Sequence, residues 1–138
     1  MDQTARDNEE VKSWYDEAAR FTKEYAVDAF PTFLIFNADG ELVHRIVGGA
    51  DAEGLLVKAK MAMDPETQFV ALQKRYKAEP DNIKVLLNTT IAAAAASDLP
   101  LANEALTRYI KIAGTTALLT PDNIQHLFPM ISLTTDAA

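Results

Sequence analysis

The run TFLIF at residues 32–36 constrains the fold of this 138-residue chain more than any other segment. It is short, aromatic and β-branched, and apolar after its first residue, which predicts a strand buried on both faces of a sheet. The turn sequence NADG follows at 37–40. Residues 41–47, with His44 and Arg45 in their middle, predict a second strand whose mixed polarity suits a sheet edge. Together these segments predict a β-hairpin.

The strand at 32–36 has too few partners in this sequence. Residues before 27 predict helix or coil, and no strand pattern follows residue 48. A strand buried on both faces normally has a neighbour along each edge, and a bare edge pairs readily with other chains. We therefore expect one of two arrangements. Either the strand pairs with a second copy in a homodimer, or the chain is the latter part of a longer protein.

The spacing of apolar residues predicts one helix on each side of the hairpin. Residues 8–25 place apolar side chains on a single stripe, and Trp14 in that stripe is expected in the core. Asp51 is expected to cap a second helix that runs to about residue 63. The inward face of this second helix is expected to carry Leu55, Ala59, Ala62 and Met63.

From residue 65 onward the sequence predicts only helices. Asp64-Pro65 predicts a helix start, because proline is favoured at the first helical position. The buried stripe of that helix is expected to carry Phe69, Leu72 and Tyr76. Further helices are expected at about 82–97 and 100–113, with another start signal at 120–122 and a weakly specified tail from Pro129. The alanines at 92–96 are expected to let a neighbouring helix pack closely.

The composition excludes several kinds of chemistry. Without cysteine the chain can form no disulfide, use no thiol nucleophile and bind no zinc through thiolates. Neither His44 nor His126 has neighbouring ligands, so each is expected to be satisfied or exposed, and we expect no metal and no cofactor. The net charge of −7 argues against a nucleic-acid partner. No apolar run approaches the roughly 18 residues of a membrane span.

The N-terminal sequence bears on the compartment. Residues 1–7 contain no apolar segment of the kind that a signal peptide needs. As written, the chain is expected in the cytoplasm. The cell envelope or periplasm becomes the expectation if a signal peptide precedes it, so the compartment stays open.

The order of these features resembles the second half of a thioredoxin fold. Residues 25–36, YAVDAFPTFLIF, resemble the stretch in which that family carries its cis-proline, and residues 40–48, GELVHRIVG, resemble its final hairpin strand. The resemblance implies a partial α/β thioredoxin-like domain at 1–63, built as helix, β-hairpin and helix. An all-α extension of helical hairpins would follow at 64–138, faintly similar to one tetratricopeptide repeat. The whole chain more loosely resembles bacterial thioredoxin-like proteins with a helical C-terminal extension.

The resemblance also implies a function. In this family a Cys-x-x-Cys motif performs thiol–disulfide exchange, and no residue of this cysteine-free chain can replace it, so no catalytic residue is assigned. Phe30, Pro31 and Thr32 match the family's peptide-binding loop, with Pro31 as the cis-proline and the backbone of Phe30 pairing with a substrate peptide. A purely structural turn is the alternative for these three residues.

Two functions follow for the chain as a whole. The first is the C-terminal portion of a thioredoxin-like thiol–disulfide oxidoreductase that acts on a protein or peptide substrate and is inactive in redox as given. The alternative is a complete, non-catalytic interaction module that self-associates through its exposed strand edge.

Overall fold

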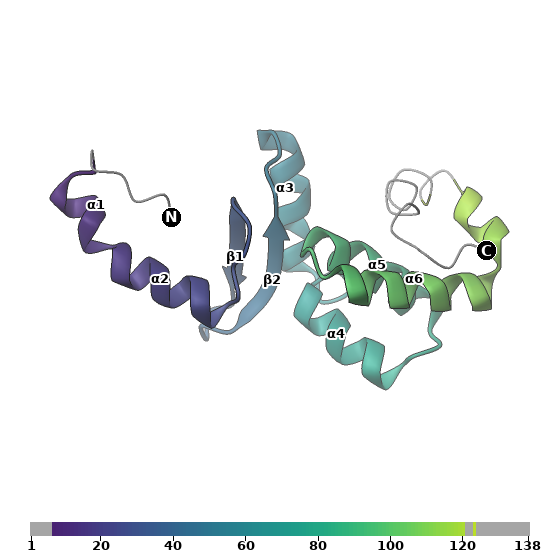
Figure 1. Ribbon diagram of the computed structural model, residues 1–138. Coiled ribbons are helices and arrows are strands. Elements are labelled where there is room, and N and C mark those ends of the chain that lie inside the picture. Colours follow the sequence, from purple (N-terminus) through teal and green to yellow (C-terminus); the bar gives the residue numbers. More distant parts are fainter. Residues whose placement is uncertain (1–6, 121–122, 124–138) are drawn as a thin grey trace.

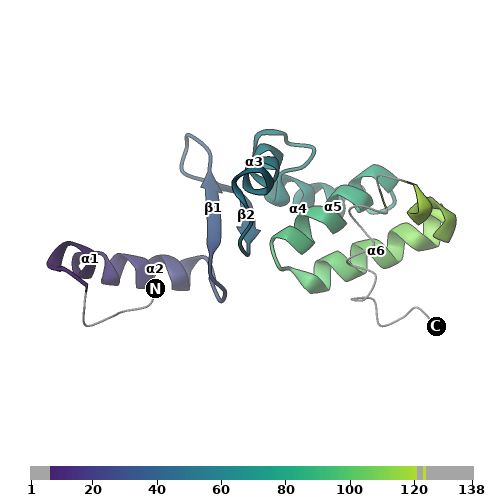
Figure 2. The same cartoon turned by 90° about the horizontal axis from the view of Figure 1, so that it is seen from above.

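The computed structural model describes residues 7–120 and residue 123 of the chain. The elements in chain order are α1 (Glu9–Ser13), α2 (Tyr15–Glu24), β1 (Thr32–Phe36), β2 (Leu42–Val47), α3 (Ala52–Lys60), the 3₁₀ turn η1 (Met61–Met63), α4 (Phe69–Ala78), α5 (Ile83–Ala95), α6 (Leu99–Ala113) and the 3₁₀ turn η2 (Thr115–Leu119). The helices α1 and α2 lie on the β1 side of the hairpin, and α3 to α6 lie on the β2 side (Figures 1 and 2). The predicted order of helix, hairpin, helix and helical hairpins is confirmed.

The hairpin forms where the sequence predicts it, because its turn is locally encoded. The side-chain oxygen of Asn37 accepts hydrogen bonds from the N–H groups of Asp39, at 3.0 Å, and Glu41, at 2.8 Å. Gly40 adopts a φ of +79°, which glycine reaches without a steric penalty. The strands then pair antiparallel, with a register shift directly after Ile35.

One edge of β1 carries no strand in the described part of the chain. The carbonyl of Pro31 accepts the N–H of Gly48 at 2.9 Å, and alternate residues of a strand direct their backbone groups to the same edge. The backbone of Phe33 therefore faces β2. The N–H and C=O groups of Thr32 and Leu34 face the opposite, free edge.

The N-terminal helices and β1 are less buried than the sequence predicts. The predicted helix over 8–25 is broken at Trp14, and the side chain of Trp14 is 60% exposed instead of lying in the core. All five residues of β1 are only half-buried, so the prediction of a strand buried on both faces is wrong. Both errors have one cause: helical and strand periodicity identify an apolar face but not what covers it.

The helix α3 begins at the predicted position but ends at Lys60, and residues 61–63 form the 3₁₀ turn η1 in place of the predicted end of the helix. The side chain of Asp51 accepts the N–H of Gly54 at 2.8 Å and caps the helix. Ala62 is buried as predicted, whereas Met63 is 83% exposed.

The predicted helix start at Asp64-Pro65 is wrong. The carbonyl of Asp64 accepts the N–H groups of Thr67 and Gln68, each at 2.9 Å, so residues 65–67 form a turn. The helix α4 begins only at Phe69. Pro65 therefore starts a turn, which suits its fixed φ equally well.

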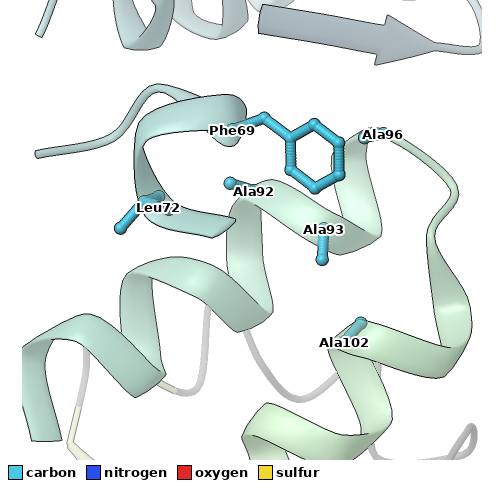
Figure 3. Packing of buried hydrophobic residues seen from close by; sticks show 6 residues of the cluster. All are labelled: Phe69, Leu72, Ala92, Ala93, Ala96 and Ala102. Carbon is cyan, nitrogen blue, oxygen red and sulfur yellow. The ribbon is translucent and has the colours of Figure 1, made fainter. Parts of the chain in front are cut away.

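The helical core matches the prediction closely. Phe69, Leu72 and Tyr76 form the buried stripe of α4, and α5 packs between α4 and α6. Ala92 and Ala93 are fully buried at this contact, and the ring of Phe69 lies over α5 beside Ala96 (Figure 3). Small side chains on α5 let its neighbours approach closely. The alanine run is therefore a packing surface.

Some predictions fall outside the described residues. These are the start signal at 121–122, His126 and the tail from Pro129. Among the helices that the structure describes, none is long and apolar enough to cross a membrane.

Candidate functional site

The three predicted site residues lie together where the chain enters β1. The bond between Phe30 and Pro31 is cis, as the resemblance implies. The hydroxyl of Thr32 donates a hydrogen bond to the carbonyl of Ala29 at 2.7 Å and closes the loop. The side chain of Phe30 points into solvent with 65% of its surface exposed. The loop therefore presents an exposed aromatic side chain two residues before β1 begins.

Arg45 holds the start of this loop, a role that the sequence did not indicate. Its guanidinium group donates hydrogen bonds to the carbonyls of Tyr25, at 3.0 Å, and Ala26, at 2.8 Å. These carbonyls stand at the C-terminal end of α2, where a positive charge is favourable. The carboxylate of Asp28 lies 3.9 Å from the same guanidinium. A charged residue in the middle of a strand was the available signal, and it indicated only a sheet edge.

His44, the preceding residue on β2, joins the hairpin to the helices. Its side chain is fully buried, and its Nδ1 accepts the N–H of Phe69 at 3.0 Å. Phe69 is the first residue of α4, so His44 caps this helix from outside. Burial lowers the pKa of His44, which favours the neutral ring that this bond requires.

The expectation that His44 is satisfied or exposed is therefore half right. Its Nδ1 is bonded, whereas its Nε2 is buried without a hydrogen-bond partner among the described residues.

The described residues offer no metal site. Within 7–120 and residue 123, no group of three or more histidine, aspartate or glutamate side chains is arranged to hold an ion.

Comparison with known proteins agrees with the fold of the hairpin and its flanking helices. Residues 1–62 match a family model described as a thioredoxin-like domain. This part of the chain is thioredoxin-like. The match includes the loop at 30–32 and both strands, and a helical region follows it. No curated protein and no solved structure matches the chain.

We call residues 1–62 the thioredoxin-like segment and the described residues from 64 to 120 the helical extension. Because the chain has no cysteine, the thioredoxin-like segment holds no Cys-x-x-Cys site. The exact division of the chain into two domains, at 63 and 64, stays a prediction.

Proposed function

We propose that the thioredoxin-like segment binds an extended peptide, as the C-terminal portion of a thiol–disulfide oxidoreductase. The observation that carries this proposal is the free edge of β1 beside the exposed ring of Phe30. In this proposal the chain supplies the binding surface, and the thiols that exchange belong to residues outside this sequence.

The free edge suits a peptide strand. Thr32 and Leu34 direct unpaired backbone donors and acceptors toward it, and an added strand gains affinity from such main-chain bonds. Phe30, at the end of this edge, offers an apolar contact that costs little side-chain entropy to hold. Backbone pairing and one aromatic contact together favour an extended, partly apolar peptide.

Replacing Phe30 with alanine tests this function. We expect Phe30→Ala to weaken the binding of a fluorescently labelled, unstructured decapeptide by about tenfold or more, because exposed aromatic anchors dominate such contacts. Fluorescence anisotropy measures the dissociation constant. Leu56→Ala is the matched control, since Leu56 is a similarly exposed apolar residue on α3, on the β2 side of the hairpin. Equal affinities of Phe30→Ala and the unaltered chain would remove the proposed role of the loop.

A second function is favoured by a separate observation. The N-terminal segment α1–α2 lies on the β1 side of the hairpin (Figure 1), and it exposes the apolar residues Val11, Trp14 and Phe21. Exposed apolar residues and a bare strand edge are both typical of protein interfaces. The alternative is therefore a non-catalytic interaction module that forms a homodimer through the strand at 32–36.

Proline at position 34 tests the homodimer. The N–H of Leu34 faces the free edge, so Leu34→Pro removes a donor to a second copy while it preserves the bonds to β2. We expect the dimer dissociation constant, from sedimentation equilibrium, to rise at least tenfold. Leu34→Val keeps the N–H and is the control. A chain that is monomeric at high micromolar concentration contradicts the homodimer.

A further inference from the structure

A groove of about 370 Å³ lies between the thioredoxin-like segment and the helical extension. Its lining includes Asp28, which belongs to the same loop as Phe30 and precedes it by two residues. One wall comes from the α2–β1 loop and β2, and the other from α4 and the turn between α5 and α6. Its lining residues are Ala26, Asp28, Arg45, Phe69, Gln73, Ala96, Ser97, Asp98 and Pro100.

Both walls of the groove are held by neighbouring residues of β2. Arg45 bonds the carbonyls of Tyr25 and Ala26 and so fixes the loop wall. His44 bonds the N–H of Phe69, whose ring packs beside Ala96 at the end of α5 (Figure 3). The groove is therefore formed before any ligand enters, which lowers the ordering cost of binding.

The groove is lined by two carboxylates and one guanidinium, and its net charge of −1 favours a cation. The carboxylate of Asp28 is 87% exposed and lies 3.9 Å from the guanidinium of Arg45, which also donates to two carbonyls. Asp98 brings a second carboxylate, whose Oδ1 accepts the N–H of Leu101 at 3.2 Å at the start of α6. Gln73 and Ser97 add neutral polar groups. The net charge of −7 on the whole chain also attracts cationic partners.

We propose that this groove takes a lysine or arginine side chain of the peptide bound at Phe30. The helical extension then determines the sequence preference of the thioredoxin-like segment, because α4 and the α5–α6 turn supply one wall of the groove. This inference rests on the peptide-binding function proposed above.

Two pairs of labelled decapeptides test the inference with the full chain. In each pair, one peptide carries two adjacent lysines and the other carries two glutamates at the same positions. These positions are at the N-terminal end of the peptide in the first pair and at the C-terminal end in the second pair. Only one end of the bound peptide can reach the groove, so we expect the preference in one pair. In that pair the lysine peptide should bind at least threefold more tightly than the glutamate peptide at low salt, since exposed ion pairs contribute modestly. Fluorescence anisotropy gives the dissociation constants.

Charge-removing variants assign the preference to the groove. Asp28→Asn and Asp98→Asn are each expected to reduce it about twofold, and the double variant to abolish it. Asparagine caps a helix as well as aspartate does, so Asp98→Asn preserves the start of α6. Asp39→Asn is the control, because it removes the same charge at the hairpin turn, the opposite end of β1.

The outcomes separate the inference from the proposed function. Two results together support the groove. The amide resonances of Gln73 and Ser97 shift when the lysine peptide is added, and only the groove variants reduce the preference for lysine. Equal affinities of lysine and glutamate peptides, with Phe30→Ala still weakening both, overturn the groove alone. An equal loss of preference in Asp39→Asn also overturns it. Absence of binding by every peptide overturns the groove and the peptide-binding function together.

Discussion

Replacing Leu72 with alanine is expected to lower the free energy of unfolding by about 2–5 kcal/mol. Leu72 is fully buried on α4, and the side chains packed around it include alanines of α5 and α6. Such short side chains cannot move far enough to fill the space that the leucine leaves, so the cost falls toward the upper end of this range. Urea unfolding followed by circular dichroism measures the change.

Leu56→Ala is the matched control for this prediction. Leu56 lies on α3 with 62% of its surface exposed, so its replacement should change the free energy of unfolding by less than about 0.5 kcal/mol. Similar losses in the two variants would mean that the contact of α4 with α5 is not the stabilising core of the helical extension.

Replacing His44 with phenylalanine is expected to destabilise the protein by about 1–3 kcal/mol. Phenylalanine has a ring of similar size but no acceptor, so the N–H of Phe69 loses the bond that it makes to Nδ1 at 3.0 Å. His44→Asn restores an acceptor near the position of Nδ1. Hydrogen exchange of the Phe69 amide is the direct readout: it should be fast in His44→Phe and slow in His44→Asn. Equally slow exchange in both variants would contradict the capping role.

The same residue predicts how stability depends on pH. Burial lowers the folded-state pKa of His44, so the unfolded chain binds more protons below its ordinary pKa of about 6.5. Stability should therefore be constant above that pH and should fall as the pH drops below it, by up to about 1.4 kcal/mol at pH 5.5. His44→Phe should lack this dependence.

Glu66 and Glu79 do not contribute to this pH dependence. Hydrogen bonds from Lys84 and Arg75 hold the pKa values of Glu66 and Glu79 below their ordinary range. These groups therefore titrate below the window from pH 5.5 to 7.5. If stability changes with pH inside this window by the same amount in His44→Phe and in the unaltered chain, His44 is ruled out as the source.

Elements encoded by neighbouring residues were predictable. The side chains of Asn37 and Asp51 bond backbone N–H groups within four residues, so the hairpin turn and the start of α3 follow from short sequence patterns. The cis bond before Pro31 was implied by the resemblance, and the family match agrees with that assignment of the segment.

Exposure was harder to predict than secondary structure. Apolar spacing places Trp14 and Met63 on helical stripes, yet both are largely exposed in the structure. Periodicity shows which face of a helix is apolar, but burial depends on whether another element packs there. The free edge of β1 was expected, because the sequence pattern predicts two strands, and the described residues form the same two.

By itself the sequence determined the hairpin, the helical extension and the absence of thiol chemistry, because turn residues, apolar spacing and the lack of cysteine are local or compositional properties. The tertiary structure alone decided the roles of His44 and Arg45. Both looked like polar residues of an edge strand, and they bond backbone groups about 20 or more residues away in opposite directions along the chain. No local pattern encodes such a contact, since it exists only once α2, β2 and α4 have come together.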